Sequence, residues 1–418
     1  MRPLHRALLP IVLATMLSGC GAFAIPPIQG QGRVLTARLL VDVEGSQRRA
    51  VDLAVQDIRA AHFTELDNVA IQEVYADDRL DGDLDPAAAR QRLRQLLAED
   101  TQRNLLGMIG PLNQDVARAE LAVANKAQLV VVSPDLTSEC LTQARLYCAK
   151  GEPNVYRPYK ATLQTTGELN FVRVCSTIDI QGPAIADYAF DSLGRHSAYI
   201  LSDDTTTSKT LVDGFTQRWA VKGGILQGAT QLDLSALADM SSTAALARLG
   251  KPELVFFATG DRARFADLAR RLAGAGGPVV FGDERVYATA SLTAQPAVDG
   301  AYVSSLAIDA EHKSPRFFAH YRARYNEAPA PYAVQAYQAT MAWAFGLRSA
   351  VAAQVQQQSS GLPFRRDVRN GVHAASVDTE DLSQVSFDDH GDNTSRLVTF
   401  YEGASGAWGF KDQTQFAD

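Results

Sequence analysis

Residues 105–134 read LLGMIGPLNQDVARAELAVANKAQLVVVSP and contain the unit that decides the fold. The apolar run Leu106–Ile109 predicts a strand that ends at Gly110-Pro111. Val116–Ala127 carries apolar residues at helical spacing, and Leu129–Val132 is a second apolar run that ends at Ser133-Pro134. Near-continuous apolar strands that alternate with helices indicate a parallel sheet covered by helices on both faces.

The same alternation continues on both sides of this stretch. Upstream, we expect strands at Val34–Val43 and Val69–Tyr75, with helices at Ala50–Ala61 and Pro86–Asp100. After Asn154–Arg157 the pattern restarts, with strands or helices at Phe171–Val174, Gln181–Leu193, Ala198–Leu201, Leu254–Phe257, Arg262–Ala275 and Val279–Phe281. The sequence therefore predicts two α/β units with a cleft between them.

The loops that follow the strands are the expected ligand-binding segments. In open parallel sheets, ligands bind beyond the carboxyl ends of the strands. We therefore expect contacts from the loops at 110–116, 133–139, 203–209, 258–262 and 282–287.

Length and charge exclude several classes of protein. The chain has 418 residues, which is enough for two or three domains, and its 40 basic and 47 acidic side chains give a net charge of −7. A nucleic-acid binder would need a basic face, so nucleic acid is not an expected partner. With 46% hydrophobic and 21% charged residues, the composition is that of an ordinary globular protein.

The N-terminus has the pattern of a secretory signal peptide. Arg2 and Arg6 precede the apolar run Ala7–Leu17, which is shorter than the roughly 20 residues that span a bilayer. The run ends Leu17-Ser18-Gly19-Cys20, which resembles the lipobox of bacterial lipoproteins, in which the cysteine is lipidated. We therefore expect a signal peptide at 1–19, lipidation at Cys20 and a tether at 20–32. Ordinary secretion with a chance cysteine is the alternative.

Three further cysteines follow Cys20. Cys140 and Cys148 are close together in a predicted loop, and an exported protein can keep disulfides, so this pair is the expected bond. Buried free thiols are the alternative. No histidine lies near enough in the sequence to suggest a catalytic cysteine.

Motifs for catalysis, nucleotides and metals are missing from the sequence. It has no P-loop, no GxGxxG after a strand, no HExxH and no GxSxG. The seven histidines show no ligand spacing, and Asp388–Asp392 lacks the closing glutamate of a calcium loop, so it predicts a turn between two strands. We therefore expect a binding protein rather than an enzyme, with no cofactor and no metal.

Several stretches, taken in order, resemble the type I periplasmic binding proteins, specifically the branched-chain amino-acid (leucine-binding) substrate-binding proteins of ABC transporters. The resemblance runs from about residue 34 to 412 and no single motif decides it. The stretches are Val69–Asp78, Ile109–Asn113, Val132–Pro134 with Thr137, Phe171–Arg173 with Asp179, Phe281–Glu284, Phe317–Tyr337, Phe387–Asp392, Val398–Tyr401 and Gly406–Trp408.

This resemblance implies an α/β fold of two lobes, each a parallel sheet flanked by helices, joined at a hinge by three crossover strands. The crossovers would fall near 155–160, 303–308 and 370–385. Lobe one would comprise 33–156 and about 305–370, and lobe two 157–304 and about 385–418. Such lobes close on a ligand while a few hinge residues change their dihedral angles.

The resemblance also implies the positions of the ligand contacts. In lobe one they are Asn113 and Gln114, then Ser133, Asp135 and Thr137. In lobe two they are Thr207, where the family usually has a tyrosine, and Glu284 beside Asp283, where the family has the acid that pairs with the ligand's ammonium group.

Each of these residues also has a purely structural interpretation. Asp135 and Thr207 could cap helices, Thr137 could bond its own backbone, and Glu284 could be a structural cap. Asp135 departs from the small residue usual in the family. Its charge would repel a ligand carboxylate, and together with Glu284 it would favour a ligand with an ammonium group.

The resemblance implies a lipid-anchored solute-binding protein of an ABC importer, on the extracytoplasmic side of the cell envelope. Its partners would be a small polar solute such as an amino acid, the permease subunits, and the membrane through the lipid. The protein would be a monomer. The alternative is a sensor or regulatory lipoprotein with the same fold and a degenerate cleft.

Overall fold

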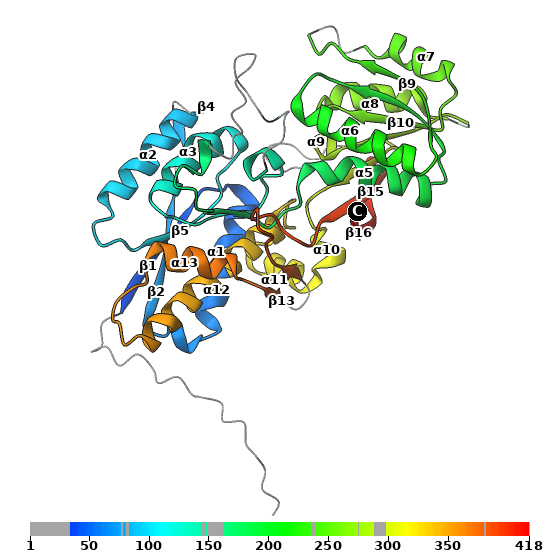
Figure 1. Ribbon diagram of the computed structural model, residues 1–418. Coiled ribbons are helices and arrows are strands. Elements are labelled where there is room, and N and C mark those ends of the chain that lie inside the picture. Colours follow the sequence, from blue (N-terminus) through cyan, green and yellow to red (C-terminus); the bar gives the residue numbers. More distant parts are fainter. Residues whose placement is uncertain are drawn as a thin grey trace, which may run out of the picture.

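The structure is a computed structural model that describes residues 34–417 except 77, 81–82, 144–147, 149–161, 236–238, 275, 288–297 and 380–381. The predicted signal peptide, the lipidation site Cys20, the tether and the crossover near 155–160 lie outside the described residues. Two lobes lie side by side; the N-terminal strands belong to one lobe and the C-terminal strands β15 and β16 to the other (Figure 1).

Lobe one is built on a parallel sheet with the strand order β2-β1-β5-β6-β7. Its strands are β1 (Leu35–Val41), β2 (Val69–Tyr75), β5 (Leu105–Ile109), β6 (Val131–Ser133) and β7 (Phe171–Arg173). All five residues of β5 are buried, as expected for a central strand covered on both faces. Between β2 and α2 in the sequence, β3 (Arg79–Leu80) and β4 (Asp83–Leu84) form a separate antiparallel pair.

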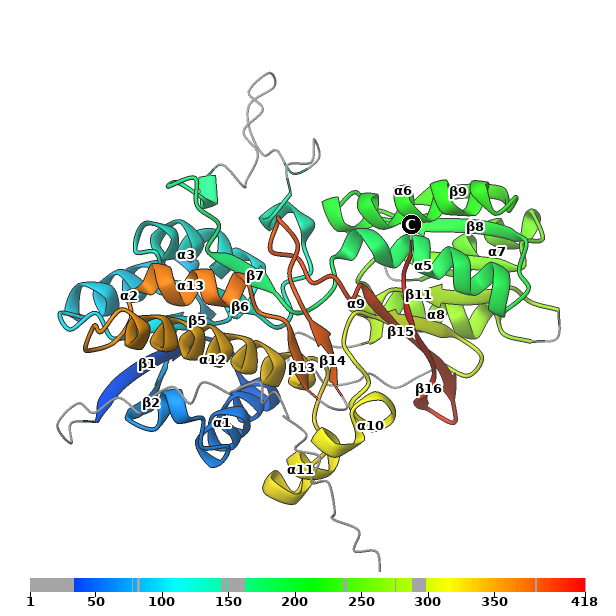
Figure 2. The same cartoon turned by 60° about the horizontal axis from the view of Figure 1, so that its bottom comes forward.

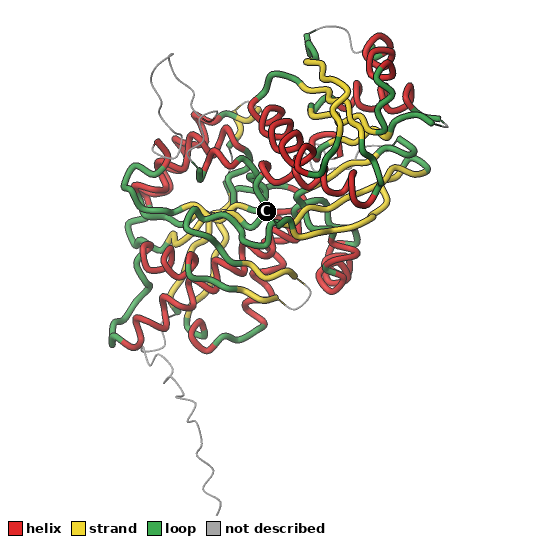
Figure 3. The backbone as a smooth tube through the Cα atoms, turned by 45° about the vertical axis from the view of Figure 1, so that its right-hand side comes forward, coloured by secondary structure: helices red, strands yellow, loops and turns green. Residues whose placement is uncertain are grey.

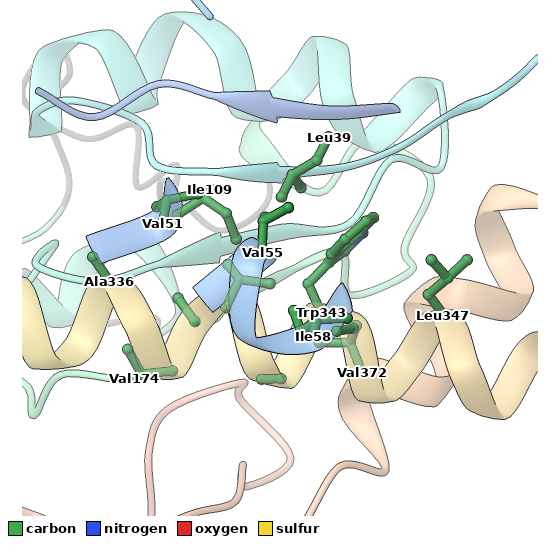
Figure 4. Close-up of a cluster of buried hydrophobic side chains, with 14 of the residues drawn as sticks. Leu39, Val51, Val55, Ile58, Ile109, Val174, Ala336, Trp343, Leu347 and Val372 are labelled. Carbon is green, nitrogen blue, oxygen red and sulfur yellow. The ribbon is translucent and has the colours of Figure 1, made fainter. Parts of the chain in front are cut away.

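Helices cover both faces of this sheet. One face packs against α2 (Pro86–Glu99) and α3 (Gln114–Lys126), through buried residues such as Leu93 and Leu121. The other face packs against α1 (Gly45–Ala60), α12 (Ala333–Gln356) and α13 (Arg365–His373). Trp343 of α12 sits in this second layer, and its ring fills the space that any side chain at Gly107 would need (Figure 4).

Lobe two is built on a sheet with the order β16-β15-β12-β11-β10-β8-β9. Its parallel strands are β8 (Ser197–Ser202), β9 (Ile225–Gln231), β10 (Leu254–Ala258), β11 (Val279–Gly282) and β12 (Tyr302–Ser305). The antiparallel pair β15 (Leu397–Ala404) and β16 (Ala407–Gln415) completes the sheet. We did not predict β9, which lies at the edge and is mostly exposed, so it lacks an apolar pattern.

Two helical layers cover the sheet of lobe two. The core on one face includes residues of α5 (Gln181–Asp187), its π-helical continuation Tyr188–Ser192 and α6 (Thr206–Val221). The core on the other face includes residues of α7 (Ser241–Leu249), α8 (Arg262–Leu272) and the short α9 (Glu284–Tyr287). Helices, strands and loops of the two lobes can be followed in the tube of Figure 3. The fold class predicted from the sequence is thereby confirmed.

The crossovers differ in part from the predicted ones. Because β7 pairs with β6, residues 171–173 belong to lobe one, and the chain passes to lobe two between β7 and α5. The predicted start of lobe two at 157 is therefore wrong. The sequence of a three-residue apolar run does not indicate which sheet the strand joins. The sheet is decided by pairing with a strand that is distant in the sequence, here β6.

The other two crossovers follow β12 and the hairpin of β13 (Val377–Thr379) and β14 (Leu382–Val385) (Figure 2). After β12 the chain passes at the predicted place to α10 (Ala310–Lys313) and α11 (Pro315–Tyr325). The hairpin still packs on α12, so the third crossing lies between 386 and 396, later than predicted.

Among the described residues, no helix has the length and apolar character needed to cross a bilayer.

A buried ion pair fastens this crossover region. The Arg173 side chain is fully buried at the end of β7, and its Nε lies 2.8 Å from Oδ1 of Asp392 in the turn that precedes β15. The same guanidinium donates to the carbonyls of Leu136 and Ser138 and, at 2.7 Å, to the hydroxyl of Thr142. One cation therefore holds the loop after β6, strand β7 and the third crossover together.

A second buried polar group lies under the loop that follows β5. Asp42, Asp78 and Glu120 place carboxylate oxygens within 4.8 Å of one another, and all three residues are buried. Asp42 also accepts a hydrogen bond of 3.2 Å from the backbone N–H of Leu112. Burial, then the charge of Asp78, raises the pKa of Glu120 to about 8, and burial followed by the charge of Glu120 raises the pKa of Asp42 well above its ordinary value. The group therefore holds protons at neutral pH.

We predict that Asp392→Ala destabilises the protein strongly, because it leaves the Arg173 charge buried without its partner. Breaking a buried pair in this way costs about 3–5 kcal/mol. Urea unfolding of wild type and variant measures the difference. Arg118→Ala, which breaks a surface pair with Asp115, is the control and should cost less than about 1 kcal/mol. Equal losses in both variants would contradict the central role of Arg173.

We predict that the acid group makes stability fall as pH rises. The folded state keeps its protons above the ordinary glutamate pKa of 4.5, so the unfolding free energy decreases from there up to the raised value of about 8. Each extra proton changes it by at most about 1.4 kcal/mol per pH unit. Glu120→Gln should flatten this slope, whereas substitution of the exposed Glu311 by Gln should not. Unfolding curves across this pH range test it, and an unchanged slope in Glu120→Gln would refute it.

Candidate functional site

Two carboxylates from opposite lobes approach each other beside the hinge. Asp135 follows β6 of lobe one, and its Oδ2 accepts a hydrogen bond of 2.8 Å from Nε2 of Gln47, in the first turn of α1. Glu284 begins α9 of lobe two and accepts hydrogen bonds from the Tyr332 hydroxyl and, at 3.1 Å, from the backbone N–H of Leu306. The sequence prediction that Asp135 and Glu284 lie on opposite lobes agrees with this geometry.

The charge of Glu284 acts on Asp135 across the lobes. Burial raises the pKa of Asp135 to about 7, the Gln47 hydrogen bond opposes this shift, and the charge of Glu284 adds to it. Burial also raises the pKa of Glu284, against the hydrogen bonds from Tyr332 and Leu306. Two buried carboxylates that repel each other do not both ionise readily. With no cation between them, the pair therefore carries less than its full double charge near neutral pH.

Two less acidic groups complete the surroundings of the pair. Tyr332 stands directly before α12 with a positive φ of 65°, and burial raises the pKa of its hydroxyl well above the ordinary value, so it acts as a hydrogen-bond donor to Glu284. Cys175 follows β7 and is a free, buried thiol. Burial raises the pKa of Cys175 well above its ordinary value, so it is not a reactive thiolate.

A small polar pocket of about 120 Å³ lies between the lobes. Its lining includes Thr137–Cys140, which follow Asp135 in the sequence. Its lobe-one side includes Gln114, whose Nε2 donates to the Ser138 hydroxyl over 3.1 Å, and Thr137. Its lobe-two side is the first turn of α6. The residues lining it are Gln114, Arg118, Thr137–Cys140, Cys148, Ile178, Thr206, Thr207 and Thr210. Three of the predicted ligand residues, Gln114, Thr137 and Thr207, therefore share one pocket.

The lobes also contact each other directly at this pocket. The Thr210 hydroxyl of α6 donates to Oε1 of Glu139 over 3.1 Å, and both residues are buried. Glu139 belongs to a 3-10 turn, Glu139–Leu141, that is tied down by the disulfide between Cys140 and Cys148, the pair expected from the sequence. The wall of the pocket in lobe one is therefore covalently braced.

Three other predicted residues have partners within the chain. Asn113 caps α3 by accepting from the backbone N–H groups of Asp115 and Val116, both at 2.9 Å. The Ser133 hydroxyl is fully buried and accepts from the backbone N–H of Leu136. Asp283 is fully buried and pairs with Arg285 at 2.8 Å. Their contact with a ligand remains a prediction, and these bonds favour structural roles.

Sequence reasoning placed one cap on the wrong residue and missed two partners. Thr205, not Thr207, caps α6, by accepting from the backbone N–H of Ser208. Gln47 and Tyr332 were not singled out. Each lies on an element remote in sequence from the acid it contacts, and no local motif marks either one. In the part of the chain that the structure describes, Asp42, Asp78 and Glu120 are the one carboxylate group spaced closely enough for a metal ion.

The chain resembles a known protein family and several solved structures. It matches the family model described as periplasmic binding protein over residues 41–402. No curated protein matches it. Among solved structures it is similar to a leucine-binding protein from Thermotoga maritima, with 18% identity, 91% of this chain and 98% of the other covered, and a TM-score of 0.61.

Two further solved structures show the same similarity. A substrate-binding protein of an ABC transporter from Desulfitobacterium hafniense, in complex with Leu, is 16% identical, with 90% of this chain and 99% of the other covered and a TM-score of 0.68. A solute-binding protein from R. palustris, in complex with benzoate, is 17% identical, with coverage of 91% and 96% and a TM-score of 0.61. On the family match, which spans most of its length, the chain belongs to the periplasmic binding protein family.

Proposed function

We propose that the protein captures a small polar solute between its lobes and delivers it to the permease of an ABC importer, while a lipid on Cys20 holds it at the outer side of the membrane. The observation that carries the proposal is that polar groups of both lobes meet. Glu284 of lobe two acts on Asp135 of lobe one, and a hydroxyl-lined pocket has walls from both lobes. Polar groups divided between two hinged lobes meet around a ligand only when the lobes close.

The similar proteins support a solute of modest size. Those structures are of transporter binding proteins in complex with leucine, isoleucine or a benzoate. Ligand pockets usually measure about 300–1,000 Å³, so the pocket of about 120 Å³ has to widen to admit such a molecule. We infer that the lobes open to load the ligand and close over it, with the dihedral changes confined to the three crossovers.

One observation favours a second candidate function. The small pocket, together with the structural partners of Asn113, Ser133 and Asp283, is what a degenerate cleft would have. The protein would then be a sensor or regulatory lipoprotein that acts through its outer surface. Binding of a small solute distinguishes the two functions.

We predict that a small solute stabilises and compacts the protein. A ligand at 100 times its dissociation constant adds about 2.7 kcal/mol to the unfolding free energy. Thermal shift against amino acids, amines and small acids finds the ligand, and small-angle X-ray scattering then detects closure as a smaller radius of gyration. Glu284→Ala should lose the effect, and exposed Glu311→Ala should keep it. A protein that responds to no probe would favour the regulatory function.

We predict that Cys20→Ser moves the protein from the membrane to the soluble extracytoplasmic fraction. One acyl chain binds a bilayer weakly, so stable anchoring requires more than one chain at this site. Fractionation followed by immunoblotting measures the distribution. Cys175→Ser, at a buried free thiol, is the control and should stay with the membrane. A Cys20→Ser protein that remains membrane-bound would contradict lipid anchoring.

A further inference from the structure

The polar side chains in the first turn of α1 already bond with other groups of the protein. Gln47, which is almost fully buried at the positive end of α1, donates to Oδ2 of Asp135. Its neighbour Ser46 bonds through its hydroxyl with the Tyr321 hydroxyl over 2.7 Å and with the backbone N–H of Ala330 over 2.9 Å. At this helix start, the carboxylate that receives a hydrogen bond is therefore a side chain of the protein.

The second oxygen of Asp135 has no such partner. Its Oδ1 atom is buried and accepts no hydrogen bond in the described structure. A buried acceptor without a donor costs about 1–3 kcal/mol, and more when it is charged. The group of the other lobe that acts on the Asp135 carboxylate is the like-charged Glu284. The missing partner of Oδ1 is therefore a hydrogen-bond donor, and a positively charged one is favoured most.

The charged groups around the pair do not supply that donor. The Arg285 guanidinium, next to Glu284 in the sequence, is already engaged: it pairs with Asp283 at 2.8 Å and donates to the Ser208 hydroxyl. The Arg173 guanidinium, two residues before Cys175 in the sequence, is paired with Asp392. The side chains that donate hydrogen bonds to the two acids, Gln47 and Tyr332, are neutral. Among the described residues, the surroundings of the acid pair are thus net negative.

We infer that the solute is an organic cation without a carboxylate group, an amine or amidine bound between Asp135 and Glu284. This inference rests on the proposed capture of a solute between the lobes. A zwitterionic amino acid would add a third carboxylate next to two. The ammonium or amidinium group by itself can bind both protein carboxylates.

Binding of such a cation releases a proton. Asp135 has a pKa of about 7, raised first by burial and then by the charge of Glu284, so a fraction of the pair is protonated near neutral pH. The cation favours the fully ionised pair, and the proton leaves for solvent. Affinity for an amine therefore increases from pH 6 to pH 8, the range around this pKa, where the amine itself stays charged.

The test is calorimetric titration with probe pairs that differ only by a carboxylate. The pairs are putrescine with ornithine, agmatine with arginine, and isoamylamine with leucine. In at least one pair the amine should bind about tenfold or more tightly than its amino acid, since a like charge in a desolvated site costs more than 1 kcal/mol. Its proton release, measured in buffers of different ionisation enthalpy, should be clear at pH 7, near the pKa of Asp135.

Asp135→Asn separates this role from a general effect on folding. The amide is nearly the same shape and can still accept from Gln47, so unfolding should change little. Amine affinity should fall about tenfold or more and proton release should disappear, because the charge is gone. Asp389→Asn removes an exposed acid of the 388–391 turn and should change neither quantity.

The outcomes separate the two proposals. Amino acids that bind as tightly as their amines, or an Asp135→Asn protein with unchanged amine affinity, would overturn the inference and leave solute capture intact. Binding of a solute without a positive charge, found in the wider thermal-shift panel, would do the same. A protein that binds none of the probes and no member of that panel would overturn both.

Discussion

The position of the candidate site depends on the buried guanidinium of Arg173. A fully desolvated charge is tolerated only when nearly all of its donors are used, and Arg173 satisfies this through Asp392, Thr142 and two carbonyls of the loop after β6. That loop carries Asp135 and Thr137. The cation thereby fixes one wall of the cleft relative to the first and third crossovers, so that movement of the hinge is transmitted to a rigid loop.

Closure of the lobes has an electrostatic cost that the fold does not remove. Asp135 is attached to lobe one through Gln47, and Glu284 is attached to lobe two through Leu306 and to the start of α12 through Tyr332. Bringing the lobes together moves two carboxylates into each other's field and removes their water. A ligand shifts a conformational equilibrium only by its differential affinity for the two states. A solute that interacts with both acids gains most of its affinity in the closed state.

Local patterns predicted the layers of the fold well, because the central strands are apolar on both faces. Val69–Tyr75 was predicted with its observed limits, and β5, β8, β10 and β11 each overlap an apolar run. Which strands pair with each other could not be predicted from local sequence patterns. Phe171–Arg173 was expected in the second lobe but completes the first sheet, and the exposed edge strand Ile225–Gln231 has no apolar pattern to predict it. In the site, resemblance indicated Asp135 and Glu284, whereas their donors Gln47 and Tyr332 come from distant elements.

The contrast between Asp283 and Glu284 shows why residue type alone does not identify a ligand contact. The two acids are adjacent in sequence and follow the same strand, but Asp283 is fully buried and forms an ion pair with the Arg285 guanidinium. It also accepts a hydrogen bond from the backbone N–H of Arg285. Glu284 receives hydrogen bonds only from groups without charge, the Tyr332 hydroxyl and the Leu306 backbone N–H. Hydrogen bonds from neutral groups stabilise a carboxylate without cancelling its charge, so Glu284 can still attract a cation from the cleft. Asp283 has no net charge left to offer, and its role is to hold Arg285 and the start of α9 in place.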